Sequence, residues 1–188
     1  MSLVNRQSPN AQTHGFNGQS KMSIYCSTEF DERFAHIDHY RIFPEMLPWV
    51  GVNYALSFKK LLVVGESHYL PTGRTVHHDS EGWYRRSNEL QLDELRGIKT
   101  RGTIGNGIGI NPSKSWKIKS KTIYRNVERA LLNSTMFNVA PQTAFTEVAF
   151  MNYFQRPGHT SGDSIHVNQL DKEVSVVVFS EVVRIIQP

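Results

Sequence analysis

The sequence has a single cysteine, no long apolar run and no recognisable cofactor motif. Cys26 alone cannot form an internal disulfide, which is typical of proteins in the reducing cytoplasm. No segment approaches the roughly 20 consecutive apolar residues of a membrane-spanning helix, and the polar start lacks the apolar core of a secretory signal. These absences predict a soluble cytoplasmic protein with no membrane partner.

The glycine-rich stretch at residues 102–109 does not supply a nucleotide-binding motif. A dinucleotide fingerprint needs a strand directly before its glycines and a helix directly after them, and neither is evident here. We therefore interpret the stretch as a flexible loop and predict no cofactor. His36 and His39 have the spacing of a metal pair, but no further ligands lie nearby in sequence. His77, His78 and Asp79, near Glu66 and His68, are the best metal-ligand candidates, but adjacent histidines seldom share one metal. Solvated or packed histidines are the favoured interpretation, and we predict no metal.

The chain of 188 residues has the size of one domain and a mildly basic charge. Residues 1–22 contain few aliphatic side chains, which predicts a disordered N-terminal tail before a single α/β domain over residues 23–188. Twenty-one Lys and Arg against 17 Asp and Glu give a net charge of +4 and a pI of about 9.2. This excess is compatible with a phosphate-bearing partner.

The centre of the predicted fold is an apolar run at residues 61–64 that leads into a polar turn. Four consecutive aliphatic residues predict a strand buried on both faces, as in a parallel sheet covered by helices. Residues 65–69 then bring a glycine, an acid, a hydroxyl, an imidazole and a phenol. Ligands bind beyond the carboxyl ends of strands in open α/β sheets, so this turn is the candidate site.

A second strand is predicted within residues 145–154, with an amphipathic helix before it. The helix covers residues 123–133, begins at a Ser120 cap and fits the crossover of a βαβ unit. Its predicted apolar face consists of Ile123, Val127, Ala130 and Leu131. A parallel second strand places Asn152 and Tyr153 beside the polar turn. An asparagine there either caps the turn or offers a donor and an acceptor to the edge of a base.

Other segments complete the predicted fold. Short helices are expected at residues 30–37 and 88–96. Apolar residues recur at helical spacing over 171–188, where many β-branched side chains favour a strand instead; we favour the helix. The chain stops where an α/β fold normally starts another strand. We therefore expect either a truncated form or a partner that completes the sheet.

The stretch at residues 113–121 combines four lysines with hydroxyls and Trp116. Lysines suit phosphate groups and an exposed ring suits base stacking, so the stretch is a candidate backbone contact for nucleic acid. A solvated entry to the following helix is an equally good interpretation. The four lysines are Lys114, Lys117, Lys119 and Lys121.

Four segments in this order resemble an uncharacterised branch of the uracil-DNA glycosylase superfamily. They are residues 48–54, 60–69, 150–155 and 179–188, and the resemblance covers roughly residues 48–188. It implies a three-layer α/β/α sandwich around a short parallel sheet, with a flipped base bound at the strand ends. It also implies DNA binding and a role in DNA repair.

The resemblance assigns roles to the strand-end residues. The first motif of the superfamily, which positions the water and contacts the base through its backbone, maps onto Gly65, Glu66, Ser67, His68 and Tyr69. Of these, Glu66, Ser67 and His68 are the catalytic candidates. The asparagine that reads the base maps onto Asn152, and Tyr69 takes the place of a tyrosine against the 5-position of the base. Gly65 and Tyr153 complete the predicted base-binding group.

The chain also departs from the most active members of that superfamily. They carry an acid where this chain has Ser67, which is a poor general base on its own. Their C-terminal histidine motif lies on an element beyond residue 188, so Glu66 or His68 would have to substitute. We therefore expect inefficient base excision, or nucleic-acid binding without catalysis.

A second hypothesis rests on Glu66 and His68 alone. Residues two apart in an extended segment face the same way, which predicts a hydrogen-bonded acid and base pair. The Gly-Glu-x-His pattern after a strand also resembles erythromycin-esterase-like hydrolases. That resemblance implies hydrolysis of a small molecule with His68 as the base and no affinity for nucleic acid. A purely structural bond that closes the strand end is the remaining interpretation of this pair.

Overall fold

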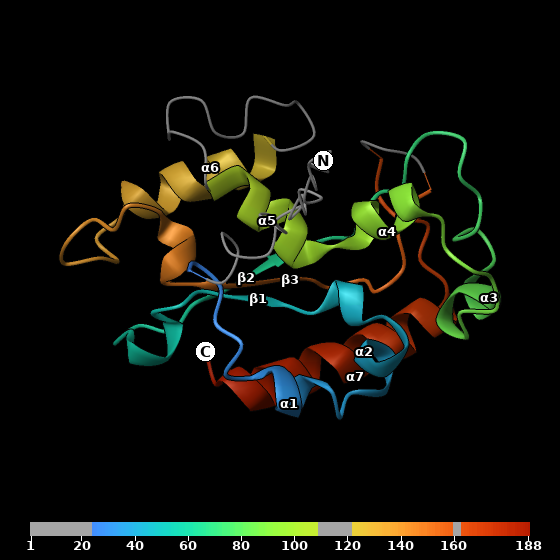
Figure 1. Cartoon of the computed structure of the whole chain (residues 1–188), viewed down its shortest axis with the longest axis horizontal. Helices are drawn as coiled ribbons and strands as arrows, with labels where there is room; N and C mark the ends of the chain where they lie inside the picture. Colours follow the sequence, from blue (N-terminus) through green and yellow to red (C-terminus); the bar gives the residue numbers. More distant parts are fainter. Residues whose placement is uncertain (1–23, 109–121, 160–162) are drawn as a thin grey trace, which may run out of the picture.

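The computed structural model describes residues 24–108, 122–159 and 163–188, which form an α/β fold around a small mixed sheet (Figure 1). The three strands lie in the order β1 (Trp49–Val50), β3 (Ala149–Asn152) and β2 (Leu62–Gly65). β2 pairs with β3 in parallel, as predicted, whereas β1 pairs with β3 antiparallel. The expectation of a purely parallel sheet is therefore wrong, because the short β1 adds an antiparallel edge.

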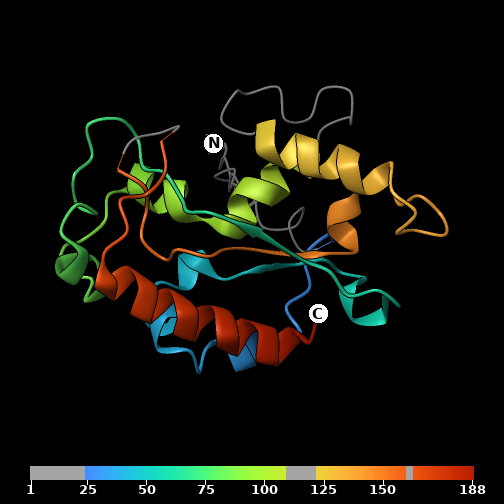
Figure 2. The same cartoon turned by 180° about the vertical axis from the view of Figure 1, so that it is seen from behind.

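Helices cover both faces of this sheet (Figures 1 and 2). α5 and α6 lie over one face, and α7 lies under the other with α1 and α2 beside it. The helices are α1 (Asp31–Phe34), α2 (Asp38–Ile42), α3 (Ser80–Tyr84), α4 (Leu92–Ile98), α5 (Thr100–Ile108), α6 (Thr122–Leu132) and α7 (Gln169–Ile186). Short 3₁₀ turns are η1 (Pro44–Met46), η2 (Tyr54–Leu56) and η4 (Ala144–Thr146).

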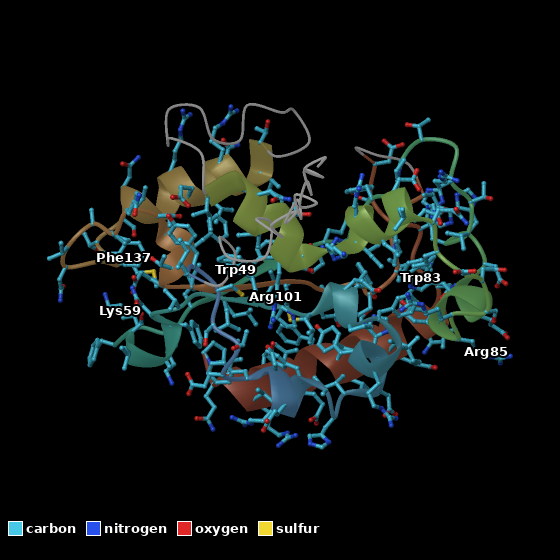
Figure 3. The ribbon with its side chains drawn as sticks, in the orientation of Figure 1. Trp49, Lys59, Trp83, Arg85, Arg101 and Phe137 are labelled. Atoms are coloured by element: carbon cyan, nitrogen blue, oxygen red, sulfur yellow. The ribbon has the colours of Figure 1, made fainter. Side chains whose placement is uncertain are left out.

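Each face of the sheet has its own apolar core. Successive strand residues point to opposite faces, so Ala149 and Met151 join the core above α7 while Phe150 joins the core below α5 and α6. Trp49 lies inside this second core, close to the sheet (Figure 3). Its indole Nε1 donates a hydrogen bond to the Phe145 carbonyl (2.7 Å), so the buried ring leaves no polar group unpaired.

The strand β2 is an edge strand, and the prediction that both of its faces are buried is wrong. β3 lies between two strands and every one of its residues is buried, whereas Leu62 and Val63 are only partly buried. Val64 is 43% exposed. The unbroken apolar run is typical of a central strand, but among the described residues nothing pairs with the outer side of β2.

The crossover helix between β2 and β3 is confirmed as α6, although its buried face differs from the predicted one. Ile123 is 56% exposed and Ala130 is also exposed. Tyr124 instead enters the core beside Phe150, with ring centroids 5.3 Å apart, and Val127 packs against the same core. The predicted Ser120 cap lies outside the described residues.

The glycine-rich stretch is helical, so its interpretation as a flexible loop is wrong. α5 runs through Gly102, Gly105 and Gly107 and ends at Ile108. Ile104 is completely buried and packs in the core that contains Trp49. Packing of this kind offsets the roughly 1 kcal/mol that each glycine costs a helix relative to alanine.

The C-terminal segment forms the 18-residue helix α7, which confirms the helical assignment. The other two short helices are shifted: residues 30–37 contribute only α1, and α4 begins four residues after position 88. The N-terminal tail and the four lysines of residues 113–121 lie outside the described residues. None of the helices in the described ranges has the length and apolar character that crossing a bilayer demands.

Candidate functional site

The carboxyl ends of β2 and β3 meet and bring Gly65 and Asn152 together, whereas the Tyr153 ring packs against Phe179 of α7 with ring centroids 5.5 Å apart. Gly65 lies opposite Asn152 in the parallel register. Beyond them, the Tyr153 N–H donates to the Gly65 carbonyl (2.9 Å) and the Phe154 N–H donates to the Glu66 carbonyl (2.8 Å). The site is therefore built on backbone pairing that holds its two segments at a fixed separation.

The side chain of Asn152 lies directly over Gly65. A Cβ atom at position 65 would be 2.3 Å from Asn152 Oδ1 and 2.9 Å from Cζ of Phe150, so only glycine fits there. Asn152 is only 6% exposed, and no hydrogen bond to its side-chain amide is formed by the described residues. Phe150 escaped the sequence prediction, although its position two residues before Asn152 places it on the same face.

Glu66 and Tyr69 form the solvent-facing part of the site. The Tyr69 hydroxyl lies 3.1 Å from a Glu66 carboxylate oxygen and 2.8 Å from the Asp163 carbonyl, and one hydroxyl hydrogen serves both acceptors. Burial raises the pKa of Tyr69 against a weaker lowering effect of the Ser67 hydroxyl, and the Glu66 and Asp163 charges raise it further. Glu66 is exposed, whereas Ser67 Oγ is buried beside Gly158 without a well-formed hydrogen bond. Ser67 is therefore not placed to activate a water in the open site.

His68 does not pair with Glu66, so the predicted acid and base pair is wrong. Its Nε2 lies 3.2 Å from Thr100 Oγ1 at the start of α5, and the ring is buried. Burial lowers the pKa of His68 to about 4, against a weaker opposing effect of the Gly97 backbone. The chain leaves the extended conformation after Gly65, so the same-side rule for residues two apart no longer applies.

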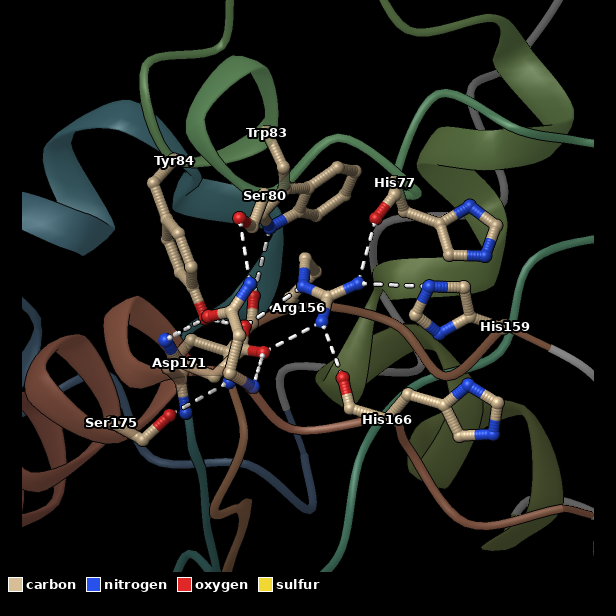
Figure 4. Close-up of polar contacts among 11 residues, drawn as sticks. His77, Ser80, Trp83, Tyr84, Arg156, His159, His166, Asp171 and Ser175 are labelled. Carbon is tan, nitrogen blue, oxygen red and sulfur yellow. Dashed lines mark hydrogen bonds and ion pairs between the residues drawn. The ribbon is translucent and has the colours of Figure 1, made fainter.

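A buried ion pair holds the chain that follows β3 (Figure 4). Arg156 donates to both carboxylate oxygens of Asp171 at 2.8 and 2.6 Å. It also donates to the carbonyls of His77 and His166, each at 2.9 Å. The Tyr84 hydroxyl donates to the same Asp171 carboxylate (2.9 Å). The network thus fixes three separate segments around the strand ends, and sequence reasoning missed it.

The fixed segment also completes the wall of the site. The backbones of Gly158 and Tyr69 form an isolated parallel β-bridge, and the Gly158 N–H donates to the His68 carbonyl (2.8 Å). A Cβ atom at position 158 would lie 2.7 Å from Cε1 of Tyr69, so the close approach requires glycine. Arg156 therefore affects the site only indirectly, because it anchors the loop that Tyr69 contacts.

Four histidines from two loops, one before α3 and one after β3, gather beside this network without forming a metal site. The rings of His78, His159 and His166 are stacked at centroid distances of 4.8 and 5.1 Å. His77 is buried, and burial followed by the nearby His78 and His159 lowers its pKa to about 4. In the described ranges, no three His, Cys, Asp or Glu side chains are placed to hold a metal ion.

The histidines at residues 36–39 do not converge either. His36 is exposed, whereas His39 is buried against Phe43 with ring centroids 5.1 Å apart. Burial, with a smaller effect of His68, lowers the pKa of His39 to about 3. His39 is therefore a packed, neutral histidine beside the core between the sheet and α7.

The strand-end site is thus a buried amide over a glycine, flanked by an exposed acid and a phenol. Comparison of the chain with protein-family models, with curated proteins and with solved structures finds no significant match. Its chemistry therefore has to be argued from Asn152, Glu66 and their surroundings.

Proposed function

We propose that the strand-end site binds a nucleobase presented by nucleic acid, in the manner of the uracil-DNA glycosylase superfamily. The observation that carries this proposal is Asn152, a residue only 6% exposed whose side-chain amide has no hydrogen-bond partner among the described residues. A partner that pairs with the donor and the acceptor of this amide gains a net free energy of about 0.5–1.5 kcal/mol for each hydrogen bond. The ends of parallel strands are also where α/β folds bind ligands.

The chemistry of the amide matches the edge of a pyrimidine base. A carboxamide accepts through its oxygen and donates through its nitrogen, and the Watson–Crick edge of uracil presents both an N–H and a carbonyl. Phe150 lies on the same face and provides an apolar ring beside the amide. The net charge of +4 favours a polyanionic partner, and the four lysines of residues 113–121 are the proposed backbone contacts.

Recognition, with little or no hydrolysis, is the proposed activity. Of the three catalytic candidates, only Glu66 is exposed to water. Ser67 is turned inward, and His68 is occupied by Thr100. A glycosidic bond needs a positioned water and a stabilised leaving base, and one exposed carboxylate supplies at most the first of these. The small-molecule hydrolase hypothesis required the Glu66 and His68 pair and is not carried forward.

The test is fluorescence anisotropy with a labelled single-stranded oligonucleotide that contains one uracil, compared with the same strand carrying an abasic site. We expect the uracil strand to bind more tightly, and Asn152→Ala to remove that preference with a loss of about tenfold. Asn126→Ala, which changes an exposed asparagine of α6, is the matched control. Equal affinities of the two strands for the native protein would refute base recognition.

Two further readings of the same samples separate binding from catalysis. If salt weakens binding, and if Lys117→Ala and Lys119→Ala weaken it at the same salt concentration, the basic stretch contacts the phosphate backbone. A base-release assay then measures excision directly. Release that Glu66→Gln abolishes would make Glu66 catalytic and overturn the proposal of recognition alone.

A further inference from the structure

The outer edge of β2 presents backbone groups that no described residue pairs with. The N–H groups of Ala149 and Tyr153 donate to the carbonyls of Leu61 and Gly65, each at 2.9 Å. Backbone groups of successive strand residues point to opposite sides, so the N–H and C=O groups of Leu62 and Val64 point away from β3. Such an edge is a template for another strand.

Apolar side chains line the same side of the molecule. Val64 is 43% exposed on β2, and Val176 is 49% exposed on α7. Phe179 and Val183 follow Val176 at helical spacing and are only half buried. Seen from behind, β2 and α7 run along this side with no other described element in front of them (Figure 2). Exposed apolar side chains beside an open strand edge are typical of an interaction site.

We propose that a second copy of this chain pairs with the β2 edge in antiparallel orientation across a twofold axis. One register uses every free backbone group of the edge: Leu62 of each copy faces Val64 of the other. The pairing forms four hydrogen bonds, because in each of the two residue pairs each N–H donates to the carbonyl of the opposite residue. It joins the two three-stranded sheets into one continuous sheet and removes both open edges.

Charge complementarity favours a second copy over an unrelated strand. In this register Lys60 of one copy, two residues before Leu62, comes close to Glu66 of the other, the residue that follows β2, and the twofold axis repeats the pair. Neither side chain has an ion-pair partner among the described residues, and both flank the apolar centre of the edge. Opposite charges that face each other across strands stabilise a pair, and like charges destabilise it.

Sedimentation-velocity ultracentrifugation across a concentration series tests the proposal. We expect the native chain to form a dimer of twice its 21.5 kDa mass. Lys60→Glu places two acids opposite each other at both ends of the edge, and we expect it to raise the dimer dissociation constant about tenfold or more. Glu66→Lys should do the same, and the combined exchange Lys60→Glu/Glu66→Lys should restore the native value because it restores both pairs.

Two controls keep the result specific to this edge. Arg129→Glu makes the same change of net charge on an exposed position of α6 and should leave the dissociation constant unchanged. Circular dichroism and the melting temperature of each variant establish that the monomer is folded. A native chain that stays monomeric at every concentration, a dimer that Lys60→Glu leaves intact, or an exchange variant without rescue would overturn the proposal. None of these results depends on whether the strand-end site binds a base.

Discussion

Removing the guanidinium of Arg156 should strongly destabilise the protein. Arg156 is almost completely buried, and its charge is balanced by the equally buried Asp171. Arg156→Met keeps most of the apolar stem but leaves a buried carboxylate with only the Tyr84 hydroxyl and the Asn168 N–H as hydrogen-bond donors. The carbonyls of His77 and His166 lose their donors as well.

The magnitude follows from the burial of the pair. Removing one partner of a buried ion pair lowers the free energy of unfolding by about 3–5 kcal/mol, because the remaining charge has neither water nor a counter-ion. A domain is typically stable by about 5–15 kcal/mol, so the loss takes a large share of the total. For a chain of this length it lowers the melting temperature by roughly 10 °C.

Urea denaturation followed by tryptophan fluorescence measures the effect. The matched control is Arg184→Met, which breaks the solvent-exposed pair with Glu181 and should cost less than about 1 kcal/mol. The double variant Arg156→Met/Asp171→Leu removes both charges, and we expect it to recover much of the lost stability. A loss below about 1 kcal/mol in Arg156→Met, or a double variant less stable than the single one, would refute the reasoning.

Two other predictions concern the site and the buried histidines. Gly65→Ala forces a methyl group against Asn152. We therefore expect urea denaturation to show a free energy of unfolding lower by about 1–3 kcal/mol, and anisotropy to show loss of the uracil preference. Unchanged binding would contradict the site geometry. Three buried histidines have folded pKa values well below 6.5, so the unfolded chain binds more protons and stability falls as the pH drops from 6.5 towards 4. Each contributes about 1.4 kcal/mol per pH unit to urea unfolding, and a flat profile would contradict this. They are His39, His68 and His77.

The sheet was predictable only where its strands are apolar and long enough to show a pattern. The parallel pairing of β2 with β3 follows from two apolar runs joined by a long connection that contains a helix. β1 has two residues and shows no periodicity, so nothing in the sequence marks it as a strand. The helix at α5 was missed because glycine opposes helix locally, whereas burial of Ile104 is a property of the folded chain.

The candidate site shows the same division between local and long-range information. The juxtaposition of Gly65 and Asn152 follows from the register of two parallel strands and was predicted. The inward turn of His68 depends on Thr100, a residue 32 positions away, and no local pattern indicates it. Asp171 did leave a signal, because Asn168 and Asp171 have the spacing of a capping box at the start of α7. Its partner Arg156 stands alone in a loop and has no such signal.

Glu66 links the two proposals, because it lies at the strand end and also at the open edge of β2. Its carboxylate already accepts a hydrogen bond from Tyr69, and in the proposed dimer it also faces Lys60 of the other copy. A carboxylate that already contacts two partners has fewer free lone pairs with which to accept a hydrogen bond, and its side chain has less freedom to position a water. The amide of Asn152, by contrast, points over Gly65 on the opposite face from the α7 side and is untouched by dimer formation. The proposed dimer would therefore leave the proposed recognition of a base intact, while it would further restrict Glu66, the exposed acid among the three catalytic candidates.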